Sequence, residues 1–253
     1  MDSFLNLRLF NMLMGFLHLG QGMLMLIVSN DFSLPVLTNY LQFDETSMRL
    51  APVSEQLTDL PLAPLIALFL VLSSIAHFTL ILPGVYSWYR ERLKKGINYA
   101  RWYEYAVSSS VMIVVISMLV GVYDLSLLIL MFFLNMMMIF WGLMMERHNQ
   151  LTRRTDWLPF VIGCVAGALV WVVIALHLLG SGGGENGVPA FVYWIFLSLF
   201  VFFNSFAVNM FLQYKKVGKW RDYVFGEKVY ILLSLLAKSA LAWQVFAGTL
   251  RPV

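Results

Sequence analysis

Two charged residues lie within long apolar segments of this sequence. Lys238 is near the middle of YILLSLLAKSALAWQVF, and Glu104 lies in RWYEYAVSSSVMIVVISML. A charge at the centre of a bilayer costs about 2.5–3.5 kcal/mol on insertion scales, so both residues are candidates for function. A buried lysine loses its proton more readily, and its neutral amine can then attack an aldehyde. The alternatives are a purely structural lysine, and a Glu104 that only pairs with Arg101, one helical turn before it.

The rest of the sequence predicts the helices that position these two residues. Of the 253 residues, 60% are hydrophobic and only 12% are charged, which excludes a soluble fold. A spanning helix needs about 20 mostly apolar residues. We therefore expect an all-α membrane protein, a bundle of seven transmembrane helices that forms one domain over residues 1–253. The expected spans are 7–29, 60–87, 98–122, 125–145, 158–180, 188–214 and 225–249.

Two connections between the expected spans have a distinct composition. The long loop 30–59 contains a β-branched and aromatic stretch, 36–43, and a second stretch, 48–53, that can pair with it. This pattern predicts a small β-hairpin on the membrane surface, with an irregular loop as the alternative. The segment GSGGGENG at 180–187 predicts a flexible loop.

The distribution of Lys and Arg predicts the orientation of the chain in the cell membrane. Fourteen of these residues lie at the N-terminus or in the second, fourth and sixth connections, against two on the opposite side. Basic residues concentrate on the cytoplasmic side of membrane proteins. We therefore expect the N-terminus inside the cell and the C-terminus outside.

Several segments of the sequence resemble heliorhodopsins, a family of retinal proteins with this inverted orientation. The segments are LLSLLAKSALAWQVFAGTL, SLFVFFNSFA, GKWRDY, RWYEYAVSSSVMIV and LPFVIGCVAG, and the resemblance extends from FLHLGQ near the start to the last residues. It implies a rhodopsin-like fold, all-trans retinal held as a protonated Schiff base on Lys238, and Glu104 as its counterion. It also implies a homodimer, to which the loop 30–59 is long enough to contribute.

The resemblance extends to polar residues around the Schiff base. Ser234 lies one turn before Lys238, where pumps related to bacteriorhodopsin have a second carboxylate, so Glu104 is expected to be the sole counterion. Ser73 and Arg101 are expected in the same hydrogen-bond network, and His18 and His77 in a polar cavity on its inner side. The alternatives are serines bonded to their own helices and histidines that only fix a hydrogen-bond network.

The expected retinal pocket is aromatic and apolar, because a polyene needs a narrow tunnel. By resemblance its residues are Tyr105, Met138, Ile139, Gly142, Trp171, Phe203 and Trp243. For each one alone, ordinary helix packing is the alternative. Asn135 and Glu146 are candidates for relaying a signal to the inner surface, with a capping role as the alternative for Glu146. Cys164, the one cysteine, is expected to be a small buried apolar residue.

These features predict a light-sensing protein rather than an enzyme, with proton transfer to the inner cavity and a conformational signal. Proton pumps that resemble bacteriorhodopsin have a donor carboxylate eleven residues after the counterion, and that position is Val115 here. The alternatives are a light-driven proton transporter or channel, and a seven-helix transporter without a chromophore. The expected partners are the lipid bilayer, a second copy of the chain, and a cytoplasmic signalling protein or enzyme. No metal or nucleic acid is expected.

Overall fold

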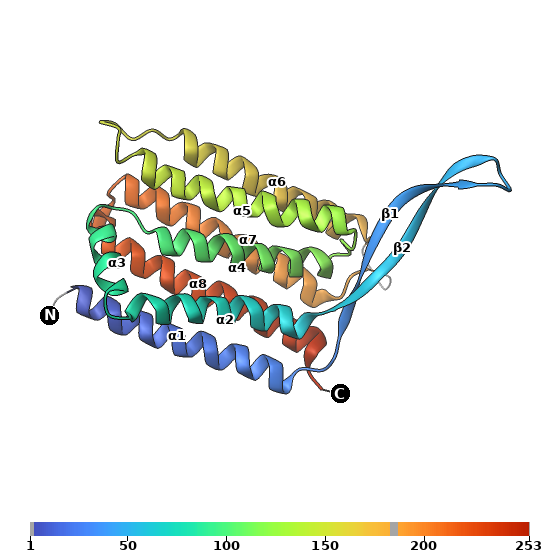
Figure 1. Ribbon diagram of the computed structural model, residues 1–253, viewed down its shortest axis with the longest axis horizontal. Coiled ribbons are helices and arrows are strands. Elements are labelled where there is room, and N and C mark those ends of the chain that lie inside the picture. The colour runs from blue at the N-terminus through green and yellow to red at the C-terminus, as the bar shows by residue number, and fades with distance from the viewer. Residues whose placement is uncertain (1–2, 183–186, 253) are drawn as a thin grey trace.

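The computed structural model describes residues 3–182 and 187–252, and it is a bundle of long helices with one projecting β-hairpin (Figure 1). Seven helical segments are long and apolar enough to cross a membrane. Their helices are α1 (Ser3–Val28), α2 (Leu62–Ile81), α4 (Tyr99–Leu119), α5 (Leu125–His148), α6 (Leu158–Gly180), α7 (Ala190–Tyr214) and α8 (Tyr223–Val245). The seven predicted spans are thus present, and the chain is a multi-pass membrane protein.

The second predicted span, 60–87, was too long at both ends. Strand β2 continues to Pro61, and α2 ends at Ile81. The chain then breaks at Leu82, whose ψ of 144° is extended, because the proline that follows disfavours a helical conformation. Gly84 has a φ of 84°, which suits glycine, and a separate short helix, α3 (Val85–Lys94), begins after it.

The two ends of the bundle differ in charge, and we name them accordingly. The basic end carries the N-terminus, α3, the α5–α6 connection and the 3₁₀ turn η1 (Gly218–Arg221). The hairpin end carries the β-hairpin, the α4–α5 connection and the C-terminus (Figure 1). Of the predicted loop 180–187, residues 180–182 and 187 are at the hairpin end, and residues 183–186 lie outside the described part of the chain.

The predicted hairpin is present and longer than expected. Strand β1 (Ser33–Asp44) pairs antiparallel with β2 (Arg49–Pro61), with a register shift between Val36 and Leu37. The backbone N–H of Leu37 donates to the carbonyl of Tyr123 over 2.8 Å, which fastens β1 to the α4–α5 connection. The distal part of the hairpin projects beyond the helices (Figure 1).

Helix α4 lies inside the bundle and packs against α2 and α5. Thirteen of its residues are buried, including Ser108, Ser110 and Ser117, and buried hydroxyls generally need a hydrogen-bond partner. The hydroxyls of Ser110 and Ser117 therefore donate to carbonyls one turn earlier in α4. This central helix is the one that presents Glu104 to its neighbours.

Large apolar side chains cover the outer faces of the other spanning helices. Examples are Ile27, Leu130 and Trp194, which are 72%, 66% and 66% exposed. Such surfaces suit a lipid environment, where they need no covering protein.

The prediction of a buried Cys164 was wrong. This residue is exposed on α6, beside the small residue Gly163.

Candidate functional site

Lys238 and Glu104 meet in the interior of the bundle. The Nζ of Lys238, on α8, lies 2.9 Å from Oε1 of Glu104, on α4. Lys238 is only 3% exposed, so its charge has little contact with the surroundings of the bundle. A buried cation needs a partner of opposite charge, and Glu104 provides it here.

Two serines complete this pair. The Nζ of Lys238 also donates to Oγ of Ser234, one turn earlier in α8, over 2.9 Å. The hydroxyl of Ser73, on α2, lies 2.6 Å from Oε1 of Glu104 and 3.0 Å from the carbonyl of Phe69. Ser73 therefore makes both contacts that were considered for it, one to the carboxylate and one to its own helix. Three helices, α2, α4 and α8, thus converge on one ion pair.

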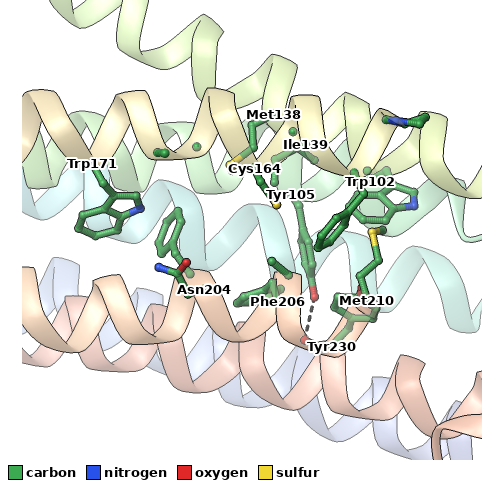
Figure 2. Close-up of a pocket in the computed structure, with 18 of the residues that line it drawn as sticks. Trp102, Tyr105, Met138, Ile139, Cys164, Trp171, Asn204, Phe206, Met210 and Tyr230 are labelled. Carbon is green, nitrogen blue, oxygen red and sulfur yellow. Dashed lines mark hydrogen bonds between the residues drawn. The ribbon is translucent and has the colours of Figure 1, made fainter. Parts of the chain in front are cut away.

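An apolar space begins at the lysine side chain. A cavity of about 60 Å³ is lined by Lys238 and Ser234 together with residues of α4, α5 and α7. It shares five lining residues with a larger cavity of about 230 Å³, namely Tyr105, Met138, Ile139, Phe203 and Phe206. Figure 2 shows this larger cavity between Trp171 and Trp102, with Tyr105 donating a hydrogen bond to the carbonyl of Tyr230 over 2.8 Å.

Six of the seven predicted pocket residues line these cavities. They are Tyr105, Met138, Ile139, Gly142, Trp171 and Phe203. A side chain at Gly142 would collide with the ring of Trp102, so the close packing of α4 on α5 requires glycine there. Trp243 is a correction: it is 38% exposed and donates to Oε1 of Gln21 on α1, over 3.0 Å. Trp243 follows Lys238 by five residues, which corresponds to about 140° around the helix. The two side chains therefore point in different directions.

The two histidines lie together on the other side of the ion pair. Their rings stack with centroids 5.6 Å apart, and Nδ1 of His77 lies 2.8 Å from Oδ1 of Asn11. His18 is fully buried, and neither of its ring nitrogens has a hydrogen-bond partner among the described residues. A small polar cavity of about 30 Å³ beside His77 is bordered by Glu104 and Arg101. The ion pair therefore has a polar side, as well as the apolar side described above.

Arg101 is a second correction. Its side chain bonds neither Glu104 nor Lys238 within the described structure. It forms ion pairs instead with Glu146, over 2.5 Å, and with Glu227. The interior of the bundle therefore holds two carboxyl groups besides Glu104, since Glu146 is 2% and Glu227 is 0% exposed.

Glu227 is a buried residue that the sequence interpretation did not single out. It lies inside the expected span 225–249, and Arg101 lies at the same end of another span. A basic and an acidic residue at equal depth in two spans was the available signal. Of the two predicted relay residues, Glu146 bonds Arg101, while the Nδ2 of the buried Asn135 lies 2.8 Å from Ser109 Oγ and 3.0 Å from Ser110 Oγ.

Comparison with known proteins gives a match to a family model. A family model described as Heliorhodopsin matches residues 7–250. This range contains all seven spanning helices except the first residues of α1, and it includes both members of the ion pair. Among curated proteins no match was found.

Proposed function

The chain belongs to the heliorhodopsin family, and from this premise we propose that it is a photoreceptor that binds all-trans retinal on Lys238. The single observation that carries this proposal is the buried Lys238 at the end of an apolar cavity. Its amine borders the 60 Å³ cavity, which shares its walls with the 230 Å³ cavity. An aldehyde with a long apolar chain fits a lysine in this position.

The residues present fit such a chromophore. Its apolar chain would be held between Tyr105, Met138 and Phe203, with Trp171 farther along the larger cavity. When bound through a Schiff base, retinal supplies absorption of visible light and a light-driven change of shape. The protein supplies the attachment point, the shape of the cavity and the negative charge of Glu104.

Glu104 is proposed as the sole counterion. Within the described chain it is the one carboxylate in ion-pair contact with Lys238, and Ser73 donates to the same oxygen. A nearby cation favours the ionised form of a carboxyl group. Glu104 therefore stays negatively charged while the nitrogen of Lys238 carries a proton.

The position of polar groups supports proton transfer toward the basic end, and a sensory role rather than pumping. His77, Asn11 and Arg101 border the polar cavity next to Glu104. In the opposite direction along α4, position 115 is a fully buried valine. The described spans contain no carboxylate in the half of the bundle that faces the hairpin end. A proton that leaves Lys238 Nζ thus has acceptors on one side.

The expected signal leaves at the basic end, which the excess of Lys and Arg assigns to the cytoplasm. Glu146 and Asn135 remain the proposed relay residues, and the receiving partner is proposed to be a cytoplasmic signalling protein or enzyme. A homodimer in the bilayer, with the hairpin contributing, is proposed as the assembly.

A visible absorption spectrum with and without all-trans retinal tests the function. We expect a visible band that appears with retinal, is bleached by hydroxylamine, and does not form in Lys238→Ala, because no amine remains at that position. A folded wild-type protein without a visible band would contradict the proposal and favour a transporter without chromophore. Light-driven currents across a voltage-clamped membrane would instead favour a transporter or channel.

A further inference from the structure

The basic end of the bundle holds two buried carboxyl groups on one cation. Arg101 of α4 lies between Glu146 of α5 and Glu227 of α8, and all three side chains are at most 3% exposed. Among the described residues, Arg101 is the one cation in ion-pair contact with either carboxyl group. With both carboxyl groups ionised, this group of three would carry a net charge of −1 inside the protein.

Such a charge is unfavourable in a buried site. Burial disfavours charged groups, and two like charges on the same partner disfavour each other's ionisation. Two carboxyl groups that interact strongly lose their protons in two separate steps, so one of them keeps its proton to a higher pH than the other. A bound metal cation would be the other way to balance the charge, but it requires oxygen ligands, whereas the groups directed at these carboxyl oxygens are N–H and O–H donors.

The hydrogen bonds distinguish the two carboxyl groups. Glu146 accepts four of them: from Arg101 Nη2 over 2.5 Å, Trp102 Nε1 over 2.6 Å, the Tyr223 hydroxyl over 2.8 Å and the Asn98 backbone N–H over 3.0 Å. Each oxygen of Glu146 thus accepts two hydrogen bonds. Hydrogen bonds donated to the charged form stabilise it, so Glu146 is the carboxylate of the pair.

From the described residues, Glu227 accepts only two hydrogen bonds, one on each oxygen. Arg101 Nη1 donates to Oε1, and Asn98 Nδ2 donates to Oε2 over 2.7 Å. The side-chain amide of Asn98 cannot flip without losing a hydrogen bond. Its Oδ1 caps α4 by accepting from the backbone N–H of Arg101 over 3.1 Å. Each oxygen of Glu227 therefore keeps one free acceptor position for a proton.

We propose that Glu227 holds a proton at neutral pH, while Glu146 is the ionised partner of Arg101. The proposal goes beyond the retinal function and does not depend on it. Five tyrosines from α3, α4, α7 and α8 face this site, and all are neutral at this pH: Tyr89, Tyr105, Tyr214, Tyr223 and Tyr230. Glu104 and His77 border the same small cavity as Arg101. The charge of Glu104 is balanced by Lys238, 2.9 Å away, and His77 bonds Asn11 and forms no ion pair among the described residues.

The proton has a structural consequence. Arg101, Glu146 and Glu227 connect α4, α5 and α8, the three helices that also carry Glu104, the pocket wall and Lys238. Removal of the proton would leave two charged carboxylates on one guanidinium. Glu227 therefore makes the connection between these helices sensitive to protons at the basic end.

Infrared spectroscopy of the full-length protein in membranes tests the proposal, with and without retinal. A protonated carboxyl group gives a C=O stretching band apart from those of carboxylates. We expect this band at pH 7, and we expect it to shift in protein made with ¹³C-carboxyl-labelled glutamate. In labelled Glu227→Asp, the band should appear at the unlabelled position, because the proton then lies on an unlabelled aspartate.

Labelled Glu146→Asp is the matched control, since it keeps both carboxyl groups and their charges. Its band should stay at the ¹³C-shifted position. If Glu227→Asp does not fold, this control alone decides between the two residues. A shifted band that persists in Glu227→Asp would overturn the proposal. So would an unlabelled band in Glu146→Asp, or a wild-type protein without any protonated glutamate band.

Discussion

At the level of single residues, the ion pair of Lys238 and Glu104 is expected to set the absorption maximum of the pigment. In Glu104→Gln the cation on Lys238 loses its partner, which is 2.9 Å away in the native protein. An unpaired buried cation releases its proton more readily, so the pigment should shift to the near-ultraviolet at neutral pH. If chloride enters the site instead, the pigment stays protonated and shifts to the red. Spectra recorded during a chloride titration distinguish these outcomes, and an unchanged absorption maximum would exclude Glu104 as counterion.

A second residue-scale prediction concerns the wall of the larger cavity. Gly142→Ala places a methyl group against the ring of Trp102, which also donates to Glu146. Overpacking of this kind costs about 1–3 kcal/mol, so the melting temperature should fall. Gly20→Ala is the control, because a side chain at that helical position meets nothing within 4 Å. A Gly142→Ala protein as stable as the Gly20→Ala protein would show that Trp102 can move without loss.

At the scale of elements, one aspartate joins the hairpin to the bundle. Asp124 caps α5 by accepting from the backbone N–H of Leu127 over 2.9 Å, and it accepts from Asn39 of β1 over 2.7 Å. These hydrogen bonds hold the pKa of Asp124 below its ordinary value. Because the folded-state pKa is the lower one, the stabilisation is present at neutral pH and is lost as the pH falls through that pKa.

Asp124→Ala should therefore lower the stability by about 1 kcal/mol, the usual cost of a lost helix cap, and expose the hairpin to protease. Asp124→Asn should be milder, because asparagine also caps helices. Thermal melts at pH 7 and pH 3, together with limited proteolysis, measure both effects. Equal losses in the two variants at pH 7 would contradict the capping role. A destabilisation by alanine that is as large at pH 3 as at pH 7 would contradict the role of the charge.

At the scale of the whole molecule, the first prediction is orientation. Because fourteen basic residues lie on one side of the spans and two on the other, the N-terminus should be cytoplasmic. A tag at the C-terminus should then bind antibody on intact cells, with a cytoplasmic protein as the control for leakage. Antibody binding only after permeabilisation of the cells would show the opposite orientation, with the C-terminus inside the cell.

The second whole-molecule prediction is a homodimer. The projecting part of the hairpin carries exposed apolar side chains, among them Leu41, Phe43 and Leu50, at 64%, 52% and 63% exposure. On one face of the hairpin these side chains form a surface that a second copy could cover. Mass measurement in mild detergent and in nanodiscs should give a dimer, and Leu41→Ser with Leu50→Ser should weaken it. A wild-type protein that is monomeric in both media would contradict the prediction.

The sequence by itself determined which segments span the membrane and which residues are chemically unusual within them. Length and composition suffice for this purpose, because a bilayer imposes its thickness on every spanning helix. Lys238 and Glu104 stood out for the same reason, since a charge in an apolar segment is visible without a structure. The break before α3 was missed, although Pro83 and Gly84 signal it, because the apolar character continues across it.

Only the tertiary structure decided which partners Arg101 and Trp243 have. Arg101 lies one turn from Glu104 in the sequence, yet it bonds Glu146 and Glu227 on two other helices. Helical periodicity assigns a residue to a face but does not say which neighbouring helix that face meets. The same limit explains Trp243, which lies on the helix of Lys238 but contacts Gln21 of α1. Partners between helices depend on how the helices are arranged and rotated, and packing of the whole bundle sets both.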